Sequence, residues 1–250
     1  MQVSINQASI GVLVFISVGF LSGCLGDRNW QYPPASTGAY LNEKAATPVA
    51  AKALVLPLED LRGDGVKEEY WKATIPLVPF GDTRYERPEK AEKPEEVDVV
   101  RFDPPNDFAK AIGAELSQAG IFSSVAFAQD EHKQPADVVF RGRLRKTDWN
   151  RRLYTYLLGP LGVVPWFLGA PMSETTTGLE MDLRLTPAND PEKVLWSMIM
   201  DFDGRRYDGP YYGLEASVES YPEAIQEALK PAISDLVNLA NQDPQRLMPK

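Results

Sequence analysis

The sequence predicts an α+β fold: a two-layer sandwich with a mostly antiparallel sheet, helices on one face, and an apolar, Gly- and Pro-rich helical insert. Alternating apolar and polar residues predict half-buried strands, because successive side chains of a strand point to opposite faces. Apolar residues that recur every three or four positions predict helices with one buried face. The strands are expected at 53–58, 121–128, 137–146, 179–186 and 194–202, and the helices at 106–120 and 221–240.

The two helices carry signals at their ends and along one face. Asn106 follows Pro104-Pro105 and can cap the first helix, which Gly120 ends. Pro231 predicts a kink or a break in the second helix, because its nitrogen cannot donate a hydrogen bond. The predicted buried residues are Phe108, Ile112, Leu116 and Ala119 in the first helix, and Ile225, Leu229, Ile233, Leu236 and Ala240 in the second.

The late strands also have predicted faces. The short turn at 187–191 joins strands 179–186 and 194–202, which predicts an antiparallel hairpin. The residues expected to face the helices are Val138, Phe140, Leu144, Leu179, Met181, Leu183 and Leu185.

Between these elements the chain is expected to be irregular. Residues 70–80 form an extended stretch broken by prolines, and 204–213 a loop rich in Tyr and Gly. Residues 82–98 are highly charged and predict a mobile loop, either a plain excursion or an interaction segment. Residues 50–242 then form a single domain, followed by a tail at 243–250.

Composition limits the possible functions. The 35 acidic residues outnumber the 26 basic ones and give a net charge of −9, which argues against a nucleic-acid partner. A hydrophobic content of 44% fits a globular domain with a sizeable core. The chain has one cysteine and one histidine, so a cysteine or histidine metal site is not expected. We expect no metal and no cofactor, and the sequence identifies no small-molecule substrate.

The most specific motif lies near the N-terminus. Leu21-Ser22-Gly23-Cys24 follows an uncharged apolar run, which is typical of a secretory signal. The motif resembles the lipobox of bacterial lipoproteins. This resemblance implies that residues 1–23 are removed as a signal peptide and that Cys24 receives diacylglycerol and a further acyl chain such as palmitate. Leu25, where an Asp would retain the protein at the inner membrane, implies the outer membrane, with the body in the periplasm.

Other interpretations of this region stay open. Cys24 could be an inert buried cysteine, the apolar stretch could span the membrane, and the protein could lie at the inner membrane or the cell surface. Residues 24–49 are rich in Ala, Thr, Pro and Gly, which predicts a flexible, lipidated tether with a reach of roughly 25–30 Å. The aromatic residues of this tether could pack on the body or lie at the lipid headgroups.

The apolar insert at 153–173 is the best candidate for function. It carries no charge, yet six Gly and Pro residues rule out a straight membrane-spanning helix, because broken backbone in lipid leaves polar groups unsatisfied. Two short helices or a helical hairpin are expected, either as a buried connection or as an exposed patch for a partner or the bilayer. The residues expected to make that contact are Tyr154, Tyr156, Trp166 and Phe167 in the insert, and Tyr211 and Tyr212 in the Tyr/Gly loop.

No catalytic constellation is evident. His132 lies in a polar loop, Asp60 and Asp64 flank a glycine turn, and Asp201 and Asp203 share a strand face. The last pair could act as acid and base in an envelope hydrolase, but a solvated strand end is the favoured explanation. A basic cluster could attract phosphates or pair with Glu180 and Asp182 on a neighbouring strand. It comprises Arg141, Arg143, Arg145, Lys146, Arg151 and Arg152.

The mature domain is similar to small periplasmic lipoproteins of the curli-secretion and penicillin-binding-protein-activator type. The similarity rests on a first strand ending in Leu56-Pro57-Leu58, on Gly120-Ile121-Phe122 after the first helix, and on the run 136–142. It implies a non-enzymatic scaffold or activator. We therefore expect a membrane-anchored protein that binds another envelope protein or complex through the insert. The alternatives are a lipid- or glycan-binding carrier, a hydrolase and, less favoured, a secretion pore.

Overall fold

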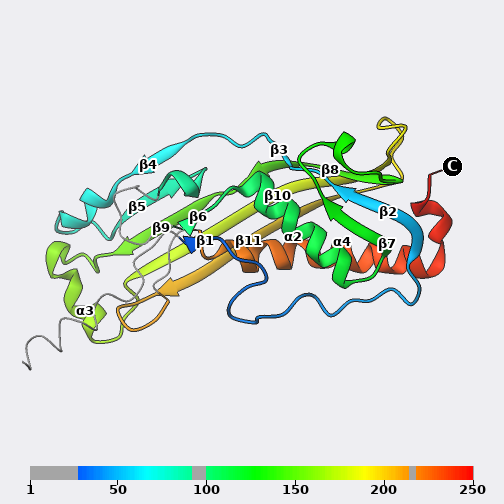
Figure 1. The fold of residues 1–250 in the computed structure, drawn as a ribbon. Coiled ribbons are helices and arrows are strands. Elements are labelled where there is room, and N and C mark those ends of the chain that lie inside the picture. Colours follow the sequence, from blue (N-terminus) through cyan, green and yellow to red (C-terminus); the bar gives the residue numbers. More distant parts are fainter. Residues whose placement is uncertain (1–27, 92–99, 214–217, 250) are drawn as a thin grey trace, which may run out of the picture.

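The computed structural model describes residues 28–91, 100–213 and 218–249. Figure 1 shows an elongated molecule in which long strands run from one end to the other. The expected signal peptide and Cys24 lie outside the described residues. Strands and helices are both well represented, so the predicted α+β class is confirmed.

A long antiparallel hairpin forms the centre of the sheet. It consists of β10 (Ser173–Pro187) and β11 (Trp196–Asp208), paired without interruption from Ser173 opposite Asp208 to Leu185 opposite Trp196. The other side of β10 pairs with β8 (Val138–Lys146) along one half and with β9 (Trp149–Tyr154) along the other. The sheet therefore forks where β8 passes into β9.

Each branch of the fork carries its own outer strands. Beside β8 lie β2 (Val49–Val55), then β7 (Phe122–Phe127), with the short β3 (Glu59–Asp60), all in parallel pairs. Beside β9 lie β5 (Phe80–Tyr85) and then β4 (Val66–Glu68), both antiparallel. A separate parallel pair joins β1 (Arg28–Asn29) to β6 (Val100–Arg101). The remaining short helices are η1 (Tyr70–Thr74), η2 (Pro88–Lys90), η3 (Glu131–Lys133), η4 (Gly159–Gly162), α3 (Val163–Phe167) and η5 (Pro244–Leu247).

Two long helices, α2 (Pro104–Gln118) and α4 (Tyr221–Gln242), cover the apolar face of the sheet. The predicted faces are confirmed: Phe108, Ile112 and Leu116 of α2 are fully buried. Gly120 has a φ of 60°, the left-handed conformation that ends many helices, and glycine adopts it without steric cost. The core also holds Phe140, Leu144, Leu179, Met181, Leu183, Leu185, Ile225, Leu229, Ile233 and Leu236.

Several predicted boundaries were wrong. The helix α2 begins at Pro104 with Asp103 as its N-cap, because proline fits the first helical turn, where the missing N–H has no partner to lose. Pro231 neither ends nor splits α4, because it lies on the exposed face. The strand β11 continues to Asp208, into the stretch expected to be a loop, and β9 was not foreseen.

The segment expected to be a flexible tether is packed against the domain over residues 28–49. Trp30 lies against Phe102 and Phe108, with ring centroids 5.3 and 5.8 Å apart. The buried carboxylate of Glu115 in α2 accepts hydrogen bonds from the hydroxyl of Tyr32 and from the backbone N–H of Leu41. This corrects the expectation of a free tether, because aromatic residues that find an apolar partner bury their surface.

Three other segments are more ordered than expected. Residues 70–80 are not extended but form η1 and a turn before β5. Of the charged stretch 82–98, residues 82–91 belong to β5, η2 and an ion-pair network, while 92–99 lie outside the described residues. In the expected tail, Leu247 is fully buried, so η5 packs on the core.

Candidate functional site

Three segments meet at one end of the sheet and form what we call the apolar tip: residues 70–79, 155–172 and 207–212. In Figure 1 this is the end that carries α3, opposite the 188–195 turn. The three segments lie at the ends of β5, β9, β10 and β11, so the sheet itself holds them together.

Close backbone contacts fix the fold of the tip. The buried Thr155 donates its N–H to the carbonyl of Pro79 at 3.0 Å, which ties the end of β9 to the start of β5. A Cβ at Gly162 would lie 2.5 Å from the carbonyl oxygen of Thr155, so glycine is required there. Leu77 donates its N–H to the carbonyl of Leu157 at 3.0 Å and joins the first two segments.

Many polar groups of the insert find partners within the tip. Backbone N–H groups of Leu158, Leu161, Leu168 and Gly169 donate to carbonyls one turn earlier. The Trp166 indole N–H donates to the Tyr154 carbonyl at 2.9 Å. The segment is therefore held in a defined conformation, although its side chains are largely outside the core.

Large apolar side chains of the tip are exposed to solvent. Of the surface that each can present, Leu168 exposes 83%, Leu77 80% and Phe167 65%. A single exposed apolar residue is ordinary, but contiguous patches mark interaction sites. The other exposed members are Tyr70, Trp71, Ile75, Tyr156, Leu157, Leu158, Leu161, Val163, Val164, Tyr207, Tyr211 and Tyr212.

The predicted contact residues lie in the tip but play different parts. Phe167 and Tyr211 are exposed, and the Tyr211 hydroxyl donates to the Phe167 carbonyl at 3.3 Å. Trp166 is half-buried, so it supports the tip through its indole N–H. Tyr156 is exposed, and its hydroxyl donates to the Pro171 carbonyl.

The two remaining predicted residues lie at the edges of the tip. The Tyr154 hydroxyl donates to Glu174 at 2.6 Å, and burial and this carboxylate raise the pKa of Tyr154 to about 12. Tyr212 is exposed and lies against Gly209.

Sequence reasoning missed the contribution of residues 70–79. Trp71 and Leu77 belong to the exposed surface, but their stretch was expected only to be extended and broken by prolines, with no part in the contact surface. The run from Ile75 to Pro79 resembles the insert in being uncharged and proline-rich, and that likeness was the available signal.

Charges of both signs surround the tip. Lys72 pairs with Glu69 at 2.8 Å, Arg152 with Asp82 at 3.0 Å, and Arg205 with Glu174 at 3.3 Å. The rim of the apolar tip is therefore polar and electrically mixed, as in protein interfaces with an apolar centre and a polar border.

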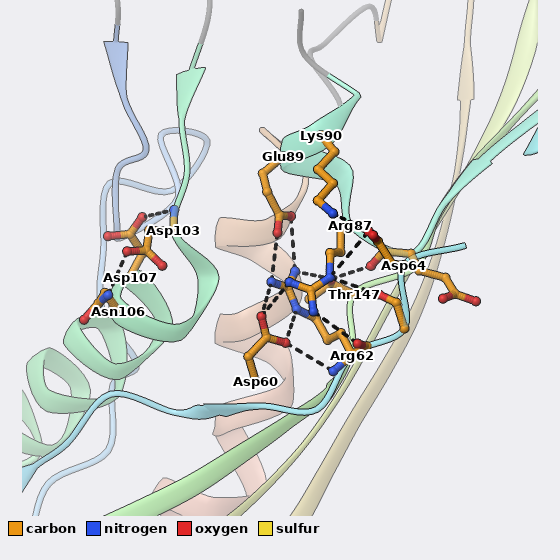
Figure 2. A network of polar contacts seen from close by, with 12 residues as sticks. Asp60, Arg62, Asp64, Arg87, Glu89, Lys90, Asp103, Asn106, Asp107 and Thr147 are labelled. Carbon is orange, nitrogen blue, oxygen red and sulfur yellow. Dashed lines mark hydrogen bonds and ion pairs between the residues drawn. The ribbon is translucent and has the colours of Figure 1, made fainter. Parts of the chain in front are cut away.

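A second concentration of polar residues lies at the fork of the sheet, around Arg62 (Figure 2). Its side chain is 2% exposed and bonds Asp60 and Glu89, each through two atoms, while Nη1 also donates to Thr147 at 2.8 Å. Arg87 donates to Asp60 at 2.8 Å, and Lys90 pairs with Asp64. These bonds use all five N–H groups of Arg62, so the network is saturated and suits a structural role.

The basic cluster is also paired. Arg143 and Arg145 both contact Asp182 across the strands, which fits the cross-strand interpretation of the cluster. Arg141 pairs with Glu131, Lys146 with Asp148 and Asp203, Arg151 with Asp208, and Arg152 with Asp82.

The acidic candidates have no catalytic surroundings in the described ranges. The Asp203 side chain is 80% exposed, and Asp201 lies opposite Glu180 in the β10–β11 register. Across residues 28–91, 100–213 and 218–249, no group of three or more His, Cys, Asp or Glu residues is placed to hold a metal ion. Within the same ranges no helix combines the length and the apolar character needed to cross a bilayer.

Comparison with known proteins gives structural likeness alone. No family model matches the sequence, and a comparison with curated proteins gives no match either. The crystal structure of protein XCC0632 from Xanthomonas campestris, of the DUF330 family, is similar at a TM-score of 0.41 and 14% identity, over 83% of this chain and 94% of that one. A PelC dodecamer structure from Paraburkholderia phytofirmans is similar at 0.34 and 16%, over 76% and 94%. These values carry no information on function.

Proposed function

We propose that this chain is a lipid-anchored protein of the bacterial cell envelope that docks on another envelope protein through its apolar tip and catalyses no reaction. The anchor is Cys24, and Leu25 favours the outer membrane with the body in the periplasm. The single observation that supports docking is the exposed, uncharged surface of the tip around Leu77, Phe167 and Leu168.

The chemistry of the tip favours a protein over a lipid surface as its occupant. Tyr and Trp are enriched in protein interfaces, and Trp71, Tyr156 and Tyr211 contribute such surface here. Surfaces that bind anionic bilayers carry excess Lys and Arg. The rim of the tip instead alternates in sign, and the chain as a whole is acidic.

The paired charges elsewhere support a binding role over catalysis. A general acid or base must have a reactive carboxyl or imidazole held beside substrate. The fork network is occupied by internal bonds, and Asp203 is open to solvent. The exposed insert does not favour the carrier alternative, in which it would line a cavity.

The docking proposal is tested by site-specific photo-crosslinking in intact cells, followed by binding of the purified partner. A photoreactive residue at Leu168 should give one protein adduct of defined mass, and one at Val194 should give none. Val194 is the matched control because it is 50% exposed but lies in the turn at the opposite end of the sheet.

The purified partner should then bind a lipid-free chain that starts at residue 25. Phe167→Asp with Leu168→Asp should weaken that binding at least about 30-fold, the loss of roughly 2 kcal/mol typical of an interface anchor. Val194→Asp should change it less than about twofold. Adducts with lipid in place of protein, or equal binding by the tip and control variants, would contradict the proposal.

The anchor is tested separately. Cells grown with labelled palmitate should label the full chain, and Cys24→Ser should abolish the label. An unlabelled wild-type chain would contradict the lipid anchor. It would not affect the docking proposal, which the crosslinking and binding experiments test.

A further inference from the structure

The strand β11 is a long open edge of the sheet. It pairs with β10 along its whole length, and the described residues place no other strand beside it. Every second residue of an edge strand directs its N–H and C=O groups away from the sheet, where another strand can bind them. β11 therefore offers 13 residues for the addition of a strand.

β11 lacks several of the usual protections of an edge, and its charged residues are of both signs. Natural edges are blunted by proline, lysine, bulges or short length. The sequence of β11 contains neither proline nor lysine, and its register with β10 has no irregularity. By contrast, the other outer strands are short: β4 has 3 residues and β7 has 6.

The side chains of β11 are sorted by face. Its odd-numbered residues from Ser197 to Tyr207 are exposed, with Ile199 70% exposed, while its even-numbered residues are buried or half-buried on the opposite face. A two-fold axis perpendicular to the sheet would place a second β11 antiparallel to the first and keep both helix layers on the same side. In that arrangement odd residues oppose odd residues.

Charge selects one register. With Gly204 on the axis, Asp203 of each copy lies opposite Arg205 of the other, and Asp201 lies opposite Tyr207. A register shift of two residues in either direction, the smallest that keeps odd residues opposite odd ones, sets Asp203 against Asp203 or Arg205 against Arg205, and like charges directly opposite each other are destabilising. Glycine on the axis also allows close approach of the two backbones.

We propose that the β11 edge binds the β11 edge of a second copy of this chain, antiparallel and centred on Gly204, to make one continuous sheet. The contact spans residues 200–208 of both copies. The side chains that set the register are exposed: Asp203 by 80% and Arg205 by 64%, so they can reach a partner. This inference is independent of what the apolar tip binds.

The register is tested by disulfide crosslinking in a chain that starts at residue 25 and therefore contains no cysteine. Opposed residues of antiparallel strands lie about 4.5–5.5 Å apart at Cα, within reach of a disulfide. An equimolar mixture of the Asp203→Cys chain and the Arg205→Cys chain should form a mixed dimer under mild oxidation. The mixture keeps one Asp203–Arg205 pair intact. Each variant alone should crosslink far less.

The association is tested by sedimentation of the same chain. The wild-type chain should form a dimer at micromolar concentration. Asp203→Arg and Arg205→Asp should each weaken the dimer at least about tenfold by opposing like charges, and the double variant should restore it. Glu192→Arg, exposed in the hairpin turn, is the matched control and should change nothing.

The outcomes that would overturn the proposal are specific. A wild-type chain that stays monomeric at about 100 µM would exclude a self-contact of useful strength. Crosslinking by Asp203→Cys alone, in place of the mixture, would exclude this register. Thermal melts at concentrations too low for dimers to form should match between the variants and the wild type, because the substituted side chains lie on the exposed face.

Discussion

The fork network and the apolar tip differ in how completely their side chains are partnered. At the fork, the buried Arg62 uses every N–H group on neighbouring residues. At the tip, Leu168 and Leu77 expose most of their surface with nothing to cover them in the described chain. The charged residues that most resemble a site are thus structural, and the apolar residues that most resemble a core are exposed.

The largest effect should come from breaking the fork network. Arg62→Met would remove the buried guanidinium that pairs with the carboxylates of both Asp60 and Glu89. Removing one partner of a buried ion pair costs about 3–5 kcal/mol. We expect that loss in the free energy of unfolding of the chain from residue 25 onward, measured in urea. A loss below about 1 kcal/mol would show that the network is dispensable.

A second prediction compares two neighbours within the tip. Trp166→Ser should lower the free energy of unfolding by about 2 kcal/mol, because the half-buried indole and its bond to the Tyr154 carbonyl are lost. Phe167→Ser should change it by less than about 0.5 kcal/mol, because that ring is exposed. Equal losses in the free energy of unfolding would show that Trp166 does not stabilise the tip more than Phe167 does.

A third prediction concerns acid. Burial alone would raise the pKa of Asp60, but its hydrogen bonds and charge contacts with Arg62 and Arg87 outweigh this and lower the pKa to about 2. A carboxyl group with a lowered folded-state pKa stabilises the fold above its unfolded pKa and loses that effect as the pH falls. We expect a loss of about 1–2 kcal/mol, after allowance for solvent screening, between pH 4 and pH 2.

The control for the acid prediction is Asp60→Asn. This variant should be less stable at pH 7 and should lose less stability between pH 4 and pH 2 than the wild type. Equilibrium unfolding at several pH values measures both quantities. Parallel pH profiles for the two chains would exclude Asp60 as the group concerned.

The smallest effect should come from the exposed pairs on the strands. The Arg143 side chain is 50% exposed and shares Asp182 with Arg145. Exposed ion pairs contribute about 0–1 kcal/mol, so Arg143→Gln should stay within that range. Urea unfolding measures this change, and a loss above about 2 kcal/mol would remove the contrast with Arg62.

Periodicity was enough to predict the helices, the central hairpin and the buried faces, because those elements are regular and their burial follows the period. It could not predict β9 at 149–154, since Arg151 and Arg152 interrupt the alternation and pair with Asp208 and Asp82 from elsewhere. It also mistook residues 28–49 for a tether, because contacts such as Tyr32 with Glu115 join residues 83 positions apart.

The tip could be predicted only in part. The absence of charge in 153–173 drew attention to the insert, but a charge-free stretch is compatible with burial or exposure. Exposure depends on which segments the sheet brings to the same end, and the contribution of 70–79 follows from the pairing of β5 with β9. The local sequence pattern does not predict which distant strands pair with each other.

If the chain is lipid-anchored as proposed, the packing of residues 28–49 limits the distance between the body and the membrane. If Cys24 carries lipid, four residue steps separate it from Arg28, whose strand pairs with β6. A fully extended chain covers about 14 Å in that distance. A lipidated chain would then move across the membrane plane as a closely held body, and it could meet only those partners whose binding surface lies within a molecular length of the headgroups.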